Sequence, residues 1–307
     1  MSDDHKLNYM NIRLLRAQNF YSQTNYTETS KVHAVELLEK AIKKLDEVIN
    51  NDFADDGNPI IKEGVSIALL CKGTILGEQG KIEEEITIYD DIDNRFGRDD
   101  SPGVREVVAL ALFNKGITLE KQGKTEETIA VYDDIDRRFA QDETPGVREQ
   151  VARALFCKGV TLMKQRKTTE EIAIYNDIDR RFGNDETPGI REQVAKAFFN
   201  KGFTLNEQGK AKEAIAIYDD IDHRFGKDET PGVREQVAKA LFCKGVALGK
   251  QDKTEEAITI FNGIDRRFGN DELPNVRDVV ASALFNRDIA LKQQGQDRRR
   301  KRNSLGE

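Results

Sequence analysis

The chain has 307 residues, 34% of them charged, and a formal net charge of −7. An acidic protein of this kind does not attract nucleic acid or anionic membranes, and no apolar run approaches the roughly 20 residues of a membrane span. The first residues lack the basic-then-apolar pattern of a signal peptide, and the three cysteines are odd in number and far apart. We therefore expect a cytoplasmic location.

The six prolines of the chain fall on one arithmetic series with a step of 43 residues: Pro59, Pro102, Pro145, Pro188, Pro231 and Pro274. Self-similarity at a fixed period of this length is typical of stacked helical units. We expect a degenerate N-terminal helical pair over residues 1–58 and five repeats over 59–273. A C-terminal capping helix over 274–296 and a basic flexible tail over 297–307 complete the predicted organisation.

Each unit is expected to contain two helices. In the first helix of the unit that begins at Pro145, Val151, Leu155 and Leu162 follow helical spacing. Thr144 stands at the N-cap position, and Pro145 fits the first turn, where its missing N–H costs nothing. The spacing thus predicts a helix that starts at the proline of every unit.

The second helix of each unit opens on a polar turn. In the unit from Pro102, Gly123 is expected to end the first helix in the left-handed conformation. Thr125 is expected to cap the second helix, whose apolar stripe consists of Tyr132, Ile135 and Phe139. The two helices of a unit are therefore joined by a tight turn and lie antiparallel.

An aspartate-rich stretch follows each apolar stripe. On the second helix, Asp133 with Arg137 and Asp134 with Arg138 are spaced as i,i+4 ion pairs, and we expect these charges to face water. A calcium-binding EF-hand loop would need glycine at its sixth position, where Phe96 stands in the first copy. A solvated, salt-bridged face is the favoured interpretation, with a calcium or catalytic site as the alternative.

Catalytic and metal-binding patterns are not visible in the sequence. It has no phosphate-binding glycine loop, no nucleophile elbow and no histidine–cysteine set at metal-ligand spacing, so we predict no enzyme, no cofactor and no metal site. Cys71, Cys157 and Cys243 share one column of the repeat and lie too far apart for disulfides. We expect them to be structural or to line a groove, with a redox or metal role as the alternative.

The units resemble tetratricopeptide repeats. In KGFTLNEQGKAKEAIAIY, Gly202, Leu205, Gly209, Ala214 and Tyr218 match the family's spacing of small and large residues. The resemblance covers about residues 59–295, although the family's usual period is about 34 residues. A lysine also precedes the first glycine, where the family commonly has an apolar residue: Lys72, Lys115, Lys158, Lys201 and Lys244.

This resemblance implies an all-α, right-handed solenoid of antiparallel helix pairs, whose first helices line a concave groove. Such proteins usually bind peptides or other proteins and rarely catalyse. A polar stripe shares one face of the first helices and forms the predicted groove. It consists of Arg153, Lys196, Lys239, Asn114, Asn200, Asn286, Thr118, Thr161, Thr204, Lys121, Lys164 and Lys250.

The resemblance also implies that Lys196, Lys239, Asn114 and Asn200 could clamp a peptide carboxylate, and a solvated groove without a ligand is the alternative. The partner is therefore expected to be a protein segment that is acidic or has a free C-terminus. A self-assembling structural or adaptor solenoid is the second hypothesis. Nucleic-acid binding through the groove lysines and the basic tail is less favoured, because the chain is acidic.

Overall fold

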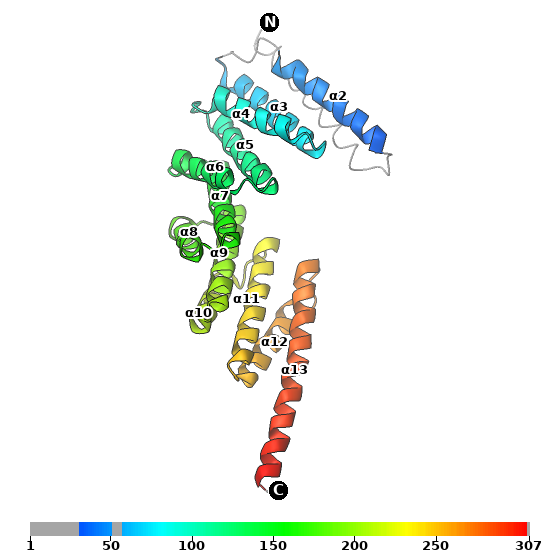
Figure 1. The fold of residues 1–307 in the computed structure, drawn as a ribbon, viewed down its shortest axis with the longest axis vertical. Coiled ribbons are helices and arrows are strands. Elements are labelled where there is room, and N and C mark those ends of the chain that lie inside the picture. Colours follow the sequence, from blue (N-terminus) through cyan, green and yellow to red (C-terminus); the bar gives the residue numbers. More distant parts are fainter. Residues whose placement is uncertain (1–30, 51–56, 306–307) are drawn as a thin grey trace. The chain divides into compact units, whose positions relative to one another are not determined.

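The computed structural model describes residues 31–50 and 57–305, except for the side chains of 31–38 and 297–305. All regular structure within these residues is α-helical, so the predicted all-α class is confirmed (Figure 1). The helices are α2 (Lys31–Ile49), α3 (Pro59–Glu78), α4 (Ile82–Phe96), α5 (Pro102–Lys121), α6 (Thr125–Phe139), α7 (Pro145–Lys164), α8 (Thr168–Phe182), α9 (Pro188–Glu207), α10 (Ala211–Phe225), α11 (Pro231–Lys250), α12 (Thr254–Phe268) and α13 (Pro274–Leu305).

The chain divides into two compact units, Met1–Ala154 and Leu155–Glu307, which we call the N-terminal and C-terminal units. In the N-terminal unit, α3 packs against α2, α4 and α5, and α5 packs against α6. In the C-terminal unit, α9 packs against α8, α10 and α11, and α11 packs against α12 and α13 (Figure 1). Each helix pair thus buries its apolar face against the neighbouring pairs, which is the arrangement of an α-solenoid.

The apolar stripe of the second helices forms the core, as predicted. Tyr132, Ile135 and Phe139 of α6 are all buried, and so are their equivalents in the other second helices. Gly123 has a φ of +73° and ends α5 in the left-handed conformation, as the sequence predicts. The position of the core therefore follows directly from the helical period.

The helix caps differ from the prediction. Thr125 does not cap α6: the N-cap residue is Lys124, and the Thr125 hydroxyl donates to the Gly123 carbonyl at 3.3 Å. At the start of α7, the backbone N–H of Thr144 donates to the Asp142 carboxylate at 2.8 Å. The aspartate three residues before the helix therefore orders this turn by an Asx-type hydrogen bond.

The aspartate-rich stretch joins successive helix pairs as well as facing solvent. In the N-terminal unit, Asp90 accepts from Lys115 at 2.5 Å, and Asp93 accepts from Arg138 at 2.7 Å. Arg138 also binds Asp134 at 3.0 Å, as predicted for an i,i+4 pair. The lysine before the glycine, where the family commonly has an apolar residue, thus forms an ion pair with the preceding helix pair. The expectation that all these charges simply face water is incomplete.

A second set of ion pairs fixes the loops between helix pairs. Arg191 of α9 donates to Asp228 at 2.7 Å, and the backbone N–H of Thr230 donates to the same carboxylate at 2.8 Å. Burial alone would raise the pKa of Asp228, but these hydrogen bonds and the charge of Arg191 lower it overall. In the N-terminal unit, Lys62 and Ser101 lower the pKa of Asp99 to about 2.

The ends of the chain differ in part from the predicted boundaries. Helix α13 continues through Leu305, so residue 296 is not a helix end (Figure 1). Helix α2 accounts for part of the predicted helical pair over 1–58. The rest of that prediction falls on residues 1–30 and 51–56, which lie outside the described residues.

Candidate protein-binding surface

Two lysines of the predicted groove occupy the same place on neighbouring helices of the C-terminal unit. Lys196 lies on α9 and Lys239 on α11, and the two helices pack against each other. Their side chains are 31% and 37% exposed, and the Lys196 ammonium lies 6.0 Å from the centre of the Phe156 ring. Each lysine therefore presents its charge at the surface while its methylene chain is partly covered.

Both lysines already have a partner on their own helix. Glu192 lies 2.6 Å from the Lys196 ammonium, and Glu235 pairs with Lys239 in the same i,i+4 geometry. Asn275 of α13 also donates to Glu235 at 2.9 Å. Burial would raise the pKa of Glu235, but the bonds from Asn275 and Lys239 lower it overall. The surface is therefore charged but not uniformly basic.

Arg153 holds the equivalent position at the end of the N-terminal unit. Its guanidinium lies 4.4 Å from the centre of the Phe113 ring, and it donates to Gln150 at 3.2 Å. Phe113 in turn packs against Tyr132 with ring centres 6.2 Å apart. This phenylalanine thus belongs to the core and also supports the arginine above it.

The polar residues between the lysines are less accessible than the sequence suggested. Thr118, Thr161 and Thr204 are buried, and their hydroxyls donate inside the protein: Thr118 to Glu85 at 3.0 Å and Thr204 to Glu171 at 2.7 Å. The hydroxyl of Thr161 donates to its own helix, at the Cys157 carbonyl. These threonines therefore position other groups and do not face a ligand.

The asparagines of the stripe have separate roles. Asn200 donates to the Tyr175 hydroxyl at 3.2 Å, and Asn286 donates to the Ser282 carbonyl of its own helix at 2.8 Å. Asn114 lines a pocket of the N-terminal unit. Asn200 and Asn286 thus have hydrogen-bond partners within the C-terminal unit, and Asn114 belongs to the N-terminal unit.

The lysines at the helix ends are the most accessible part of the stripe. Lys121, Lys164 and Lys250 are exposed, each at the last residue of its helix. A cation at this position interacts favourably with the negative, C-terminal end of the helix dipole. Their place is therefore explained by helix stability.

A pocket of about 340 Å³ adjoins Lys239 between α11 and α13. Its walls include Phe242 from α11 and Asn275, Asp278 and Ser282 from α13. An aromatic wall beside a lysine and an amide is suited to one side chain of a bound segment.

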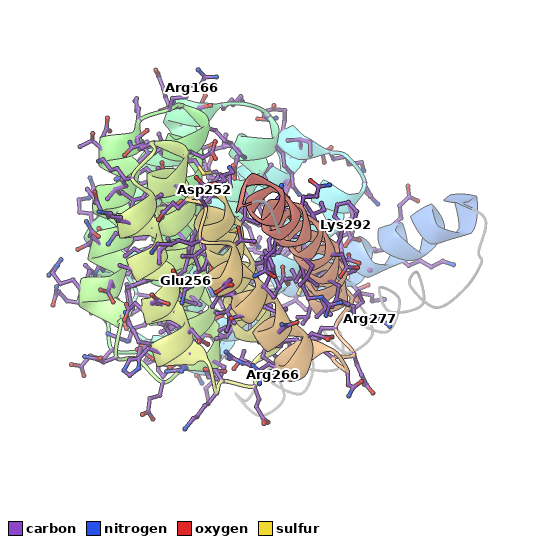
Figure 2. The ribbon with its side chains drawn as sticks, turned by 90° about the horizontal axis from the view of Figure 1, so that it is seen from below. Arg166, Asp252, Glu256, Arg266, Arg277 and Lys292 are labelled. Carbon is purple, nitrogen blue, oxygen red and sulfur yellow. The ribbon has the colours of Figure 1, made fainter. Side chains whose placement is uncertain are left out.

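The second helices also carry arginines. Arg180 of α8 and Arg266 of α12 are exposed, and Figure 2 shows Arg266 directed away from the neighbouring helices. Arg138 and Arg224, by contrast, join successive helix pairs. Of these four arginines, only Arg180 and Arg266 can therefore be changed without disturbing the packing of the helix pairs.

Sequence reasoning missed two buried carboxylates, Glu85 and Glu171. Both occupy a column of the second helix where other units have Thr128, Ala214 or Ala257. An acidic residue in a column of small residues was the available signal.

Across the described residues, no group of three histidine, cysteine or acidic side chains could hold a metal ion, and no helix is long and apolar enough to cross a membrane.

The cysteines are partly buried free thiols. Burial raises the pKa of the Cys71 and Cys243 thiols, which keeps them protonated. The Cys243 thiol lies beside the buried Tyr218 hydroxyl, whose pKa burial also raises.

Comparison with known proteins gives the fold. No protein-family model and no curated protein matches the sequence. The crystal structure of BtubC (BKLC) from P. vanneervenii is similar with a TM-score of 0.58 and 12% identity, over 79% of this chain and 92% of that chain. A tetratricopeptide repeat protein from Parabacteroides merdae matches with a TM-score of 0.42 and 15% identity, over 90% and 99%.

A further match is TTC0263, a thermophilic tetratricopeptide repeat protein of Thermus thermophilus. Its TM-score is 0.37 at 17% identity, over 73% of this chain and 98% of that chain. Tetratricopeptide repeat proteins are therefore among the structural matches, and the chain itself is a helical repeat of packed pairs. The predicted fold of packed helix pairs is confirmed by the structure itself.

Proposed function

We propose that the chain is a protein-interaction scaffold. In this proposal, the first helices of the C-terminal unit bind a partner segment that carries acidic side chains or a free C-terminal carboxylate. The observation that carries the proposal is the equivalent placement of Lys196 and Lys239 on the packed helices α9 and α11. Both ammonium groups are partly exposed and can donate to a carboxylate.

The helix spacing sets the expected pattern of the ligand. Packed helices lie about 10 Å apart, and an extended segment advances about 3.4 Å per residue. Side chains on one face of an extended segment recur every second residue, so carboxylates two positions apart, about 7 Å from each other, come nearest to the spacing of the two lysines. The pocket beside Lys239 accepts a neighbouring side chain against Phe242.

The resident glutamates allow this exchange. An i,i+4 pair on a helix surface contributes only about 0.2–0.5 kcal/mol, so Lys196 and Lys239 can leave Glu192 and Glu235 at little cost. The bond from Asn275 at 2.9 Å keeps Glu235 in place when the lysine turns away. A ligand carboxylate would then replace each glutamate as the partner of the lysine.

The test uses a displayed peptide library with free C-termini, rich in aspartate and glutamate. Selected peptides are titrated against the wild type, against Lys196→Glu with Lys239→Glu, and against the control Arg180→Glu with Arg266→Glu. At about 1 kcal/mol for each partly exposed pair, the groove variant should bind roughly thirtyfold more weakly. An unchanged groove variant, or an equal loss in the control, would reject the surface.

Self-association is a second candidate function, and helix α13 favours it. Phe285 is 68% exposed, and Ile289 is exposed one turn later. The equivalent Phe242 packs against Phe261 with ring centres 6.2 Å apart, whereas Phe285 has no such aromatic neighbour among the described residues. Light scattering over a concentration series should show association of the wild type that Phe285→Glu abolishes. A wild type that stays monomeric throughout the series would exclude it.

A further inference from the structure

The N-terminal unit contains a pocket whose lining includes Asn114, Thr118 and Lys121 of the predicted groove. It has a volume of about 530 Å³ and lies between α3, α4 and α5. Ile82 of α4 and Ile117 of α5 give it apolar walls, and Glu85 lies among its polar lining residues. This volume is within the range of small-ligand sites.

The Glu85 carboxylate is held without a cation. It is 8% exposed, and one of its oxygens, Oε1, accepts from the Tyr89 hydroxyl at 3.1 Å and the Thr118 hydroxyl at 3.0 Å. Burial first, and then the charge of Glu85, raises the pKa of Tyr89, so the phenol keeps its proton and donates. No lysine or arginine of the described chain forms an ion pair with Glu85. Burying a carboxylate in this way is costly unless a cation joins it.

The equivalent carboxylate in the C-terminal unit is more deeply buried and lies next to a different residue of the repeat. Glu171 accepts from Thr204 at 2.7 Å but is only 1% exposed, and burial raises its pKa. Met163 stands in the column that Gly77 occupies in α3. A Cβ atom at Gly77 would lie 2.7 Å from the carboxyl carbon of Glu85. The glycine therefore lets the Glu85 carboxyl group approach α3 more closely than any side chain at this position would allow.

We propose that this pocket binds the cationic side chain of a lysine or arginine from a partner protein. The aliphatic stem would lie between Ile82 and Ile117, and the charged group would donate to Glu85. Thr74 adds an acceptor, because its own proton is donated to the Leu70 carbonyl at 3.1 Å. The site lies in the other unit and selects the opposite charge from the surface described above, so it goes beyond the proposed function.

Two substitutions at the pocket are expected to change the binding of a cation in opposite directions. Glu78 and Lys121 both line the pocket, and Lys121 is exposed. Lys121 repels a cation, so Lys121→Gln should tighten binding by about two- to fivefold, the size expected for an exposed pair. Glu85→Gln should weaken it at least tenfold, because a charge-assisted hydrogen bond is lost.

The probes are n-butylammonium, N-acetyl-lysine amide and N-acetyl-arginine amide, with n-butanol as the neutral control. Binding to the full chain is followed by NMR of the isoleucine methyl groups. We expect saturable shifts at Ile82 and Ile117 in the millimolar range for the cations and none for n-butanol. The stronger of the two amino-acid probes identifies the preferred side chain.

Matched variants separate the pocket from general surface charge. Gly77→Ala should displace Glu85 and weaken binding at least tenfold, like Glu85→Gln. Gly249→Ala, in the same column with only Ala257 at 4.0 Å, and Glu171→Gln should bind as the wild type does. Wild-type melting temperatures in all variants establish that they are folded. The absence of saturable shifts, or equal binding by Glu85→Gln, would overturn the proposal.

Discussion

Replacing Asp228 tests whether the loop ion pairs hold successive helix pairs together. Asp228 accepts from the Thr230 backbone at 2.8 Å and from Arg191 at 2.7 Å, and its side chain is 10% exposed. Loss of a capping acceptor costs about 1 kcal/mol, and loss of a charge-assisted bond about 1.5–3 kcal/mol. Asp228→Ala should therefore lower the free energy of unfolding by about 2.5–4 kcal/mol. Asp228→Asn keeps an acceptor for Thr230 and should cost about 1–2 kcal/mol.

The control for this experiment is an aspartate of the same repeat whose ion pair is more exposed. Asp220 lies 3.4 Å from Arg224 on the same helix and is 41% exposed, so Asp220→Ala should cost only about 0.5 kcal/mol. Urea unfolding of the full chain, followed by circular dichroism at neutral pH, gives the three values. If Asp228→Ala and Asp220→Ala were equally stable, the loop ion pair would not contribute as argued.

Three further predictions concern backbone strain, a buried hydroxyl and acid stability. Arg166 and Asp252, at the turns labelled in Figure 2, have φ of 59° and 61°. In urea unfolding, Arg166→Gly should stabilise the fold by about 0.5–1 kcal/mol. Asp252→Gly should stabilise it by less, because aspartate tolerates this conformation. Cys243→Asn should add up to about 1 kcal/mol by donating to the buried Tyr218 hydroxyl, as Asn200 does to Tyr175, and a loss of folding would contradict this. Because the pKa of Asp99 is lowered to about 2, its stabilisation is present above about pH 4 and lost as the pH falls towards 2. Acid titration should therefore show a smaller loss of stability in Asp99→Asn than in the wild type.

The sequence predicted the fold through the helical spacing of its apolar residues, because this spacing decides which side of each helix is buried. Tyr132 and Ile135 were placed in the core on that ground, and the structure buries both. The cap of α6 was predicted wrongly, because Lys124 and not Thr125 holds the N-cap position, whereas α7 begins at Pro145 as predicted. Reading one helix alone also concealed the Asp93–Arg138 pair, since these residues lie in successive units.

The candidate surface was harder to predict than the fold. Helical spacing placed Thr118 and Lys196 on one stripe but could not distinguish a buried hydroxyl from an exposed ammonium. Glu85 was missed because its environment depends on Gly77 of the preceding helix, and only packing brings the two residues together. Comparing columns of the repeat, and not single motifs, would have identified Glu85 as unusual.

A charge-swap titration tests the account's central claim, that Lys196 and Lys239 bind partner carboxylates. An acidic peptide selected from the library, and the same peptide with its two key carboxylates changed to lysine, are titrated against the wild type and against Lys196→Glu with Lys239→Glu. The account predicts that the wild type prefers the acidic peptide and that the double variant prefers the lysine peptide, since each reversal restores the pairing. If the double variant still preferred the acidic peptide, the lysines would not be the binding groups and the claim would be contradicted.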